Sequence, residues 1–137
     1  MRIVLDTNVL MSGIFFSGPP YRILQAWRDG RVQICISPEI FEEYLAVAER
    51  LSEQFPSVEI APILGLLAIE AELCEATPLP APVCDDPDDD KFLACAIAAS
   101  CTCIVSGDKD LLRVSGYGSI EIVRPREFLE VRLELSD

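Results

Sequence analysis

The stretch "RIVLD" at residues 2–6 is a short apolar run that ends on a carboxylate. Uninterrupted apolar runs of this length are typical of strands buried on both faces, as in parallel sheets. Further runs of this kind are "VQICIS" at 32–37, "CTCIVS" at 101–106 and "IEIV" at 120–123. We therefore expect a sheet of buried strands in which Asp6 lies at the carboxyl end of the first.

Helical patterns separate these runs. Ser37 followed by Pro38 is a typical helix start, and Gly30 is a typical helix stop. The expected helices cover residues 19–29, Pro38 to about Leu51, about Val58 to Ala71 and Pro87 to about Ser100, with a helical turn around Leu111 and a last helix from Pro125. Strands that alternate with helices predict a mainly parallel sheet covered by helices on both faces.

The chain of 137 residues has the size of one domain, and the proline-rich connection at 77–82 is too short to separate two. We therefore predict a single domain over residues 1–137. No apolar run approaches the roughly 20 residues of a membrane span, so we expect a protein of the cytoplasm with no membrane partner. The six cysteines include no C-x-x-C pair and lie mostly in apolar segments, so we interpret them as reduced core residues.

The composition restricts the chemistry that the protein can perform. The sequence contains no histidine, which excludes Ser-His-Asp and Cys-His catalysis and disfavours zinc. Its formal net charge of −12 argues against binding nucleic acid through positive charge alone. That charge fits a bound cation, a basic protein partner, or solubility without a specific role.

Acidic side chains follow two of the expected strands. Asp6 ends the first strand, and Asp108 lies two residues beyond the strand that ends at Ser106. Ligands of open parallel sheets bind at the carboxyl ends of the strands, where both aspartates are expected. A plain structural role remains open for each, because Thr7 and Asn8 are typical of a helix-capping turn and "SGDKD" around Asp108 is typical of a polar turn.

The helix from Pro38 contributes a third acidic position. At about 100° per residue, Ile40, Tyr44 and Val47 lie at the centre of one apolar face, and Glu43 is the acidic residue of this helix nearest to that face. An acidic side chain at such a margin either reaches into a crevice or extends to water. Both interpretations of Glu43 stay open at this point.

Five aspartates occupy six positions at the start of "DDPDDDKF", residues 85–92. Helix capping explains much of this cluster, because Asp86 is a good N-cap, Pro87 suits the first helical position, and acids in the first turn complement the helix dipole. The following helix is apolar on every side, so periodicity leaves open whether Asp89 or Asp90 points inward.

Several carboxylates that converge without histidine or compensating lysine repel one another unless a cation lies between them. Oxygen ligands of this kind suit Mg²⁺ or Mn²⁺. Such an ion can orient a phosphodiester, activate a water molecule and stabilise the leaving oxygen. The acidic residues therefore favour a metal-dependent phosphodiester hydrolase.

Four segments follow one another in a recognisable order. They are "IVLDTNVLMSGIF" from Ile3, "ISPEIFEEYLAV" from Ile36, "DDPDDDKFLACAIA" from Asp85 and "CIVSGDKDLL" from Cys103. In this order and spacing they make the chain resemble the PIN-domain family of metal-dependent ribonucleases, in particular the toxin components of bacterial toxin–antitoxin pairs. The resemblance implies a three-layer α/β/α sandwich with a central, mainly parallel sheet.

The resemblance also implies the site and its chemistry. The metal-binding catalytic positions fall on Asp6, Glu43, Asp89 and Asp108, further acidic positions that contribute to the metal site fall on Asp86 and Asp110, and supporting polar positions fall on Asn8 and Ser106. Within the aspartate cluster, the family's spacing to a small helix residue, here Ala96, selects Asp89.

The implied activity is cleavage of single-stranded RNA by a water molecule that Mg²⁺ or Mn²⁺ activates, leaving 5′-phosphate and 3′-hydroxyl ends. The implied partners are a second copy of the chain, as a homodimer, and a basic antitoxin protein. RNA contacts would then involve the metal and a few cations such as Lys91, Lys109 and Arg113.

Two other interpretations remain. In the first, the acidic residues belong to a non-catalytic module that binds RNA or a protein. In the second, the sheet is that of a haloacid-dehalogenase-like phosphatase, which needs a second aspartate two residues after the strand-end nucleophile. Asn8 occupies that position, which argues against the phosphatase.

Overall fold

The apolar runs of the sequence form one parallel sheet in the computed structural model, which describes residues 1–135. Its strands are β1 (Arg2–Leu5), β2 (Gln33–Ile36), β3 (Glu72–Leu73), β4 (Cys103–Val105) and β5 (Glu121–Val123). They lie in the order β3-β2-β1-β4-β5, and every neighbouring pair in this described part of the chain is parallel. The predicted α/β fold with a parallel sheet is therefore confirmed, and β1 occupies the middle of the sheet.

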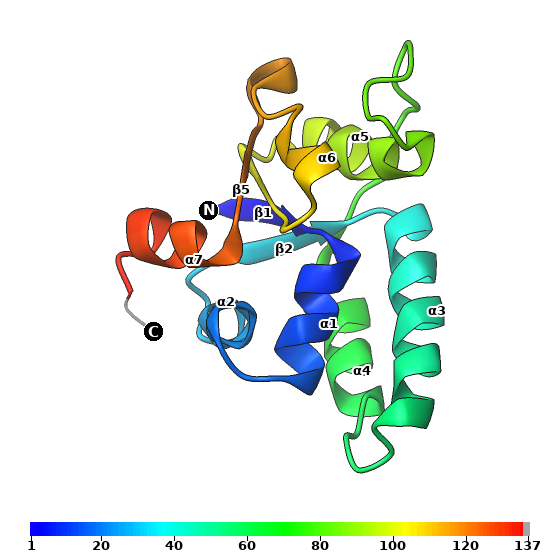
Figure 1. Cartoon of the computed structure of the whole chain (residues 1–137), viewed down its shortest axis with the longest axis vertical. Coiled ribbons are helices and arrows are strands. Elements are labelled where there is room, and N and C mark those ends of the chain that lie inside the picture. The colour runs from blue at the N-terminus through cyan, green and yellow to red at the C-terminus, as the bar shows by residue number, and fades with distance from the viewer. Residues whose placement is uncertain (136–137) are drawn as a thin grey trace.

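Helices flank this sheet. They are α1 (Thr7–Phe15), α2 (Pro19–Arg28), α3 (Pro38–Gln54), α4 (Ala61–Glu70), α5 (Asp90–Ala98), α6 (Lys109–Leu112) and α7 (Pro125–Glu127), with 3₁₀ turns at Pro87–Asp89 and Tyr117–Ser119 and a π-helical turn at Phe128–Arg132. Figure 1 shows α1 and α2 on one side of the strands and α5 and α6 on the other. α5 packs directly against β1, β2 and β4, while α1 packs against α2 and α3. Within residues 1–135, none of the helices has the length and apolar character needed to cross a bilayer.

Two of the predicted helix ends are confirmed by their hydrogen bonds. The Ser37 side chain accepts a hydrogen bond from the Ile40 amide at 3.3 Å and caps the start of α3. Beyond the end of α2, the Arg31 amide donates to the Ala26 carbonyl at 2.8 Å. This closure requires a φ of +79° at Gly30, which glycine adopts without steric cost.

Other boundaries differ from the predicted ones, and proline explains two of the differences. α4 begins at Ala61, later than predicted, because Pro62 suits the first turn of a helix. α3 extends past its predicted end to Gln54 and stops where Pro56 disfavours helical backbone at the residue before it. The predicted helix after the aspartate cluster starts as a 3₁₀ turn, Pro87–Asp89, before α5 begins.

A close contact between α1 and α2 depends on Gly13. A Cβ atom at this position would lie 2.7 Å from Leu24 Cδ1 and 2.9 Å from the carbonyl oxygen of Pro20. That oxygen belongs to the backbone and cannot move aside without shifting α2. Gly65, in α4, contrasts with Gly13, because a Cβ built there meets no described atom within 4 Å apart from its chain neighbours and the nearby backbone of its own helix.

We predict opposite effects of the same substitution at the two glycines. Gly13→Ala should lower the free energy of unfolding by about 1–3 kcal/mol, because the added methyl group overpacks the α1–α2 contact. Gly65→Ala should raise it by roughly 0.5–1 kcal/mol, because glycine weakens a helix interior. Urea unfolding followed by circular dichroism measures both values, and equal effects would contradict the close approach of the two helices.

Candidate active site

Asp6 is a buried carboxylate directly after β1, with 7% of its surface exposed. It stands at the N-cap position of α1, but its side chain makes no capping hydrogen bond. The hydroxyl of Ser106, directly after β4, donates to Asp6 Oδ2 at 2.7 Å. The same buried hydroxyl accepts from the Asp108 amide at 3.0 Å. One side chain therefore joins Asp6 to the segment that carries Asp108.

The pKa of Asp6 is raised above its ordinary value. Burial is the largest cause, and the charges of Asp108 and Glu43 act in the same direction. Hydrogen bonds from Ser106 and from the Thr7 amide act in the opposite direction and are outweighed. The ionised form of Asp6 would therefore gain from a nearby cation.

The structure distinguishes Asp89 from Asp90, which sequence periodicity leaves equivalent. Asp90 turns back to the preceding connection, where its carboxylate accepts from the Val83 amide at 3.2 Å and the Cys84 amide at 2.8 Å. Partial burial raises the pKa of Asp90, but these hydrogen bonds outweigh it and hold the pKa below its ordinary value. Asp90 is thus a structural acid that holds the connection against the start of α5.

Asp89 has the opposite electrostatic environment. Burial, followed by the charges of Asp108, Asp6 and Asp86, raises the pKa of Asp89 to about 7, although Lys91 acts in the other direction. Asp89, Asp6 and Asp108 are therefore close enough to repel one another. Asp89 therefore stays the predicted member of the acidic centre, in preference to Asp90.

Glu43 is positioned by α3, which packs against the end of β1. The buried Tyr44 hydroxyl donates to the Leu5 carbonyl at 2.5 Å and fixes this helix beside Asp6. Both carboxylate oxygens of Glu43 are engaged, because the Thr7 hydroxyl donates to Oε2 and Lys91 Nζ donates to Oε1 at 2.5 Å. The expectation of an acidic centre without a compensating lysine is therefore wrong at Glu43.

Asp108 and Asp86 both cap helical turns. The side chain of Asp108 accepts from the Asp110 amide at the start of α6, and that of Asp86 accepts from the Asp88 amide, each at 3.0 Å. The capping explanation is confirmed for both residues. Each cap uses one carboxylate oxygen, Oδ1, and a carboxylate has capacity for further partners.

Asn8 and Asp110 have different surroundings from the central acids. Asn8 is exposed on α1. Asp110 forms an ion pair with Arg113 at 2.9 Å, and Arg113 also donates to Asp85 at 2.7 Å. Arg113, which sequence reasoning proposed as an RNA contact, is therefore already engaged by carboxylates of the chain itself.

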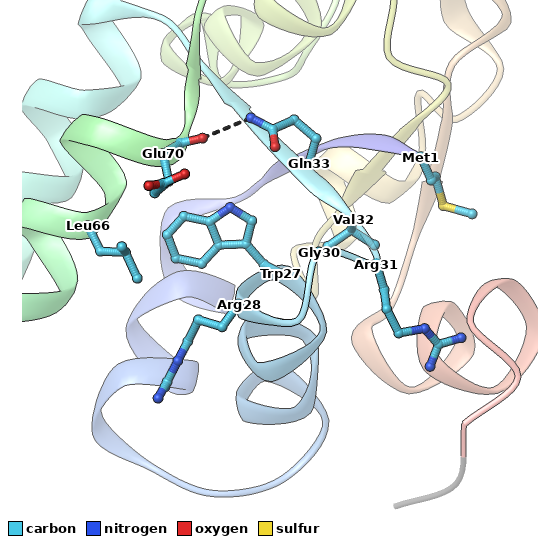
Figure 2. Close-up of a pocket in the computed structure, with 9 residues that line it drawn as sticks. All are labelled: Met1, Trp27, Arg28, Gly30, Arg31, Val32, Gln33, Leu66 and Glu70. Carbon is cyan, nitrogen blue, oxygen red and sulfur yellow. Dashed lines mark hydrogen bonds between the residues drawn. The ribbon is translucent and has the colours of Figure 1, made fainter.

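Two hollows of similar size lie at different edges of the sheet. One, of about 470 Å³, opens beside the Lys91–Glu43 pair and is lined by Glu39, Glu42, Glu43, Pro87, Asp88 and Lys91. The other, of about 450 Å³, lies around Trp27 near the amino ends of β1 and β2, where the Gln33 side chain donates to the Glu70 carbonyl at 2.9 Å (Figure 2). The predicted acidic residues do not line this second hollow. They gather at the carboxyl edge, where parallel sheets bind their ligands.

The acidic centre has the type of ligand atom that a hard divalent cation prefers, because its side chains offer carboxylate oxygens. It also fits in charge, since the repulsion that raises the pKa of Asp89 is relieved by a cation. Within residues 1–135, however, no three acidic or cysteine side chains converge closely enough to form a ready-made metal site. Asp6, Asp89 and Asp108 are the residues that would hold the ion, and Glu43, the fourth predicted position, is engaged by Lys91 and Thr7.

The chain has an all-parallel α/β sheet with acidic side chains at the carboxyl ends of β1 and β4. Folds of this class can carry a metal-dependent hydrolase site. Residues 2–110 match the PIN domain family. The chain therefore belongs to the PIN domain family, whose members are typically metal-dependent nucleases. No curated protein matches the chain.

We predict that removing the charges of Asp89 and Asp90 has opposite effects on the metal-free protein. Because the pKa of Asp89 is raised to about 7, the native state retains a proton there that the unfolded state releases, so stability falls as the pH rises from about 4 to about 7. Asp89→Asn should therefore raise the free energy of unfolding above about pH 7 and change it little below about pH 4. Asp90→Asn should lower it by roughly 1–3 kcal/mol near neutral pH, because an amide cannot accept both backbone hydrogen bonds as the carboxylate does.

Urea unfolding in the presence of EDTA at several pH values measures both effects. If Asp89→Asn instead lowers the free energy of unfolding above pH 7, as expected for Asp90→Asn, then Asp89 is a structural acid and does not belong to the acidic centre.

Proposed function

We propose that the protein is an endoribonuclease that uses Mg²⁺ or Mn²⁺ to hydrolyse phosphodiester bonds in single-stranded RNA. The observation that carries this proposal is the mutual repulsion of Asp6, Asp89 and Asp108 at the carboxyl edge of a PIN-domain sheet. A divalent ion bound between these carboxylates would relieve their repulsion, and the chain lacks the histidine that metal-free nucleases commonly use as general base.

Each acidic residue has a distinct part in the proposed reaction. Asp6, Asp89 and Asp108 hold the ion, and Ser106 orients the carboxylate of Asp6 through its hydrogen bond. When bound, the ion supplies an activated water molecule and stabilises charge on the phosphate. In the loaded site Asp89 would be ionised, and its carboxylate could then accept a proton from water.

The charge of the protein limits how RNA can bind. The net charge is −12, and Lys91 and Arg113 are paired with carboxylates of the chain. Contacts between phosphate and the metal ion therefore supply most of the attraction in this proposal, so RNA affinity should depend more on the metal than on salt-sensitive lysine and arginine contacts. The same net negative charge suits a basic antitoxin, which supports the proposed role as a toxin of a toxin–antitoxin pair.

The alternative function is that of a non-catalytic module that binds RNA or a protein. The engagement of Glu43 by Thr7 and Lys91, together with the lack of a ready-made metal site within residues 1–135, favours this alternative. The two functions differ in their response to metal, because only the nuclease requires it for its activity.

We predict that the purified protein cleaves an unstructured, fluorescently labelled RNA in the presence of Mn²⁺ and that EDTA stops the cleavage. Asp6→Asn and Asp89→Asn should each lower kcat by more than the roughly 10- to 100-fold that loss of an outer-shell metal partner costs. Asp29→Asn, which removes an exposed charge at the end of α2, is the matched control and should leave the rate unchanged. Binding of RNA without cleavage, unaffected by EDTA, would favour the non-catalytic module.

We also infer that α4 forms a homodimer interface. Ile69 on this helix and Leu73 in the following strand β3 are 79% and 64% exposed, and Glu70 is the single charged residue in the helix. Like-charge repulsion between two copies with a charge of −12 each is smallest where few charged side chains lie, and burying exposed apolar side chains such as these favours association.

Ile69→Glu should therefore shift the protein from dimer to monomer in sedimentation velocity experiments, because it places a charge in the apolar interface. Val131→Glu is a matched control, since Val131 is 64% exposed in the π-helical turn near the C-terminus. A wild-type monomer, or a dimer that survives Ile69→Glu, would contradict the assignment of the interface.

A further inference from the structure

Lys91 lies in the first turn of α5 and is directed at the acidic centre. Its Nζ donates to Glu43 Oε1 at 2.5 Å and to Asp88 Oδ2 at 2.9 Å. The Lys91 side chain is only 16% exposed, and that of Glu43 is 26% exposed, whereas that of Asp88 is 72% exposed. Glu43 is therefore the stronger partner, because an ion pair with an exposed acid contributes little in water.

We propose that Lys91 is a built-in counter-ion that occupies the position beside Glu43 where a divalent cation would bind. Metal binding must then break the Lys91–Glu43 ion pair. This inference rests on the proposed function, since it assigns a regulatory role to a residue of the same site. Lys91 acts through Glu43 and is a positioning residue.

The charges around Glu43 explain why a counter-ion is needed. Thr7, whose hydroxyl donates to Glu43, directly follows Asp6, so the two carboxylates lie on adjacent parts of the site. Asp6 is itself buried, and the hydroxyl of Ser106 already donates a hydrogen bond to its carboxylate. The ammonium group of Lys91 offsets the charge of Glu43 and lets α3 approach the other acids.

The surroundings of Lys91 support this role. Its ammonium group donates to two carboxylates, and its side chain is only 16% exposed. A monovalent positive charge held beside Glu43 competes with a divalent ion for the same oxygen.

The position of Lys91 also determines where the ammonium group goes when metal displaces it. Lys91 lines the hollow of about 470 Å³ that opens beside Glu43. A flexible lysine released from Glu43 can extend into this opening, next to the proposed metal position. The released ammonium group is then available to a phosphate of the bound RNA.

Calorimetry with Mn²⁺ and no RNA tests the proposal on the purified full chain. Lys91→Gln should tighten Mn²⁺ binding by about 3- to 10-fold, because the competing positive charge is gone. Lys91→Arg keeps the charge and should bind Mn²⁺ with the wild-type affinity. Arg50→Gln, which removes one exposed positive charge further along α3, controls for the change in net charge and should also show the wild-type affinity.

A second substitution tests whether the effect acts through Glu43. In the Glu43→Gln background, Lys91→Gln should give a smaller gain in Mn²⁺ affinity than in the wild-type background, because the ion pair is already absent. A salt bridge that merely fastens α3 to α5 would change the unfolding temperature without this coupling to metal.

Nuclear magnetic resonance of the wild-type protein keeps the proposal testable if Lys91→Gln fails to fold. The hydrogen-bonded lysine ammonium signal, assigned by its loss in Lys91→Arg, should be present without metal and disappear on titration with Mg²⁺. Persistence of that signal at saturating Mg²⁺ would overturn the proposal, as would unchanged or weaker Mn²⁺ binding in a folded Lys91→Gln variant.

The failure of this inference is distinguishable from the failure of the proposed function. If the wild-type protein binds Mn²⁺ and cleaves RNA but Lys91→Gln leaves the affinity unchanged, only the role of Lys91 is rejected. If neither protein binds Mn²⁺, both the counter-ion and the metal-dependent function are rejected.

Discussion

The carboxylate of Asp6 is buried at the end of the central strand, and burying a charge costs several kcal/mol unless hydrogen bonds or a cation compensate for it. The parallel pairing of β1 with β4 sets Leu5 beside Val105, so the next residues, Asp6 and Ser106, meet across the sheet edge. Their hydrogen bond at 2.7 Å supplies part of the compensation. The rest of the site is arranged around the negative charge that remains.

The protein relieves that charge in two ways before any metal arrives. Asp89 has a raised pKa of about 7 and is partly protonated near neutral pH, so it does not add a full charge beside Asp6 and Asp108. Glu43 is neutralised by Lys91 instead. Both arrangements are reversible, and the divalent cation that we propose would replace both, so that the acidic site could be stable when empty and still bind metal. The net charge of −12 thus reflects acids used inside the site as well as acids at the surface.

The fold was predictable because its signals are local. Apolar runs identify four of the five described strands, and Ser37 and Asp86 identify helix starts through their own side chains. The edge strand β3 has only two residues, too few for any periodic pattern. The resemblance to PIN domains selected Asp89, whereas residue patterns alone left it equivalent to Asp90. The difference between Asp89 and Asp90 in the structure depends on the Val83 and Cys84 amides of the irregular connection before α5, which bind Asp90. The Lys91–Glu43 pair joins residues that are 48 apart in the chain. Such long-range polar contacts depend on how the helices dock, which no single segment encodes.

A crystal of the wild-type protein soaked in Mn²⁺ tests most directly whether this acidic edge is a metal centre. We expect an anomalous peak bounded by the carboxylates of Asp6, Asp89 and Asp108, at oxygen distances of about 2.1–2.3 Å. A saturating soak that leaves this position without a peak, or that places manganese only elsewhere on the surface, would contradict it.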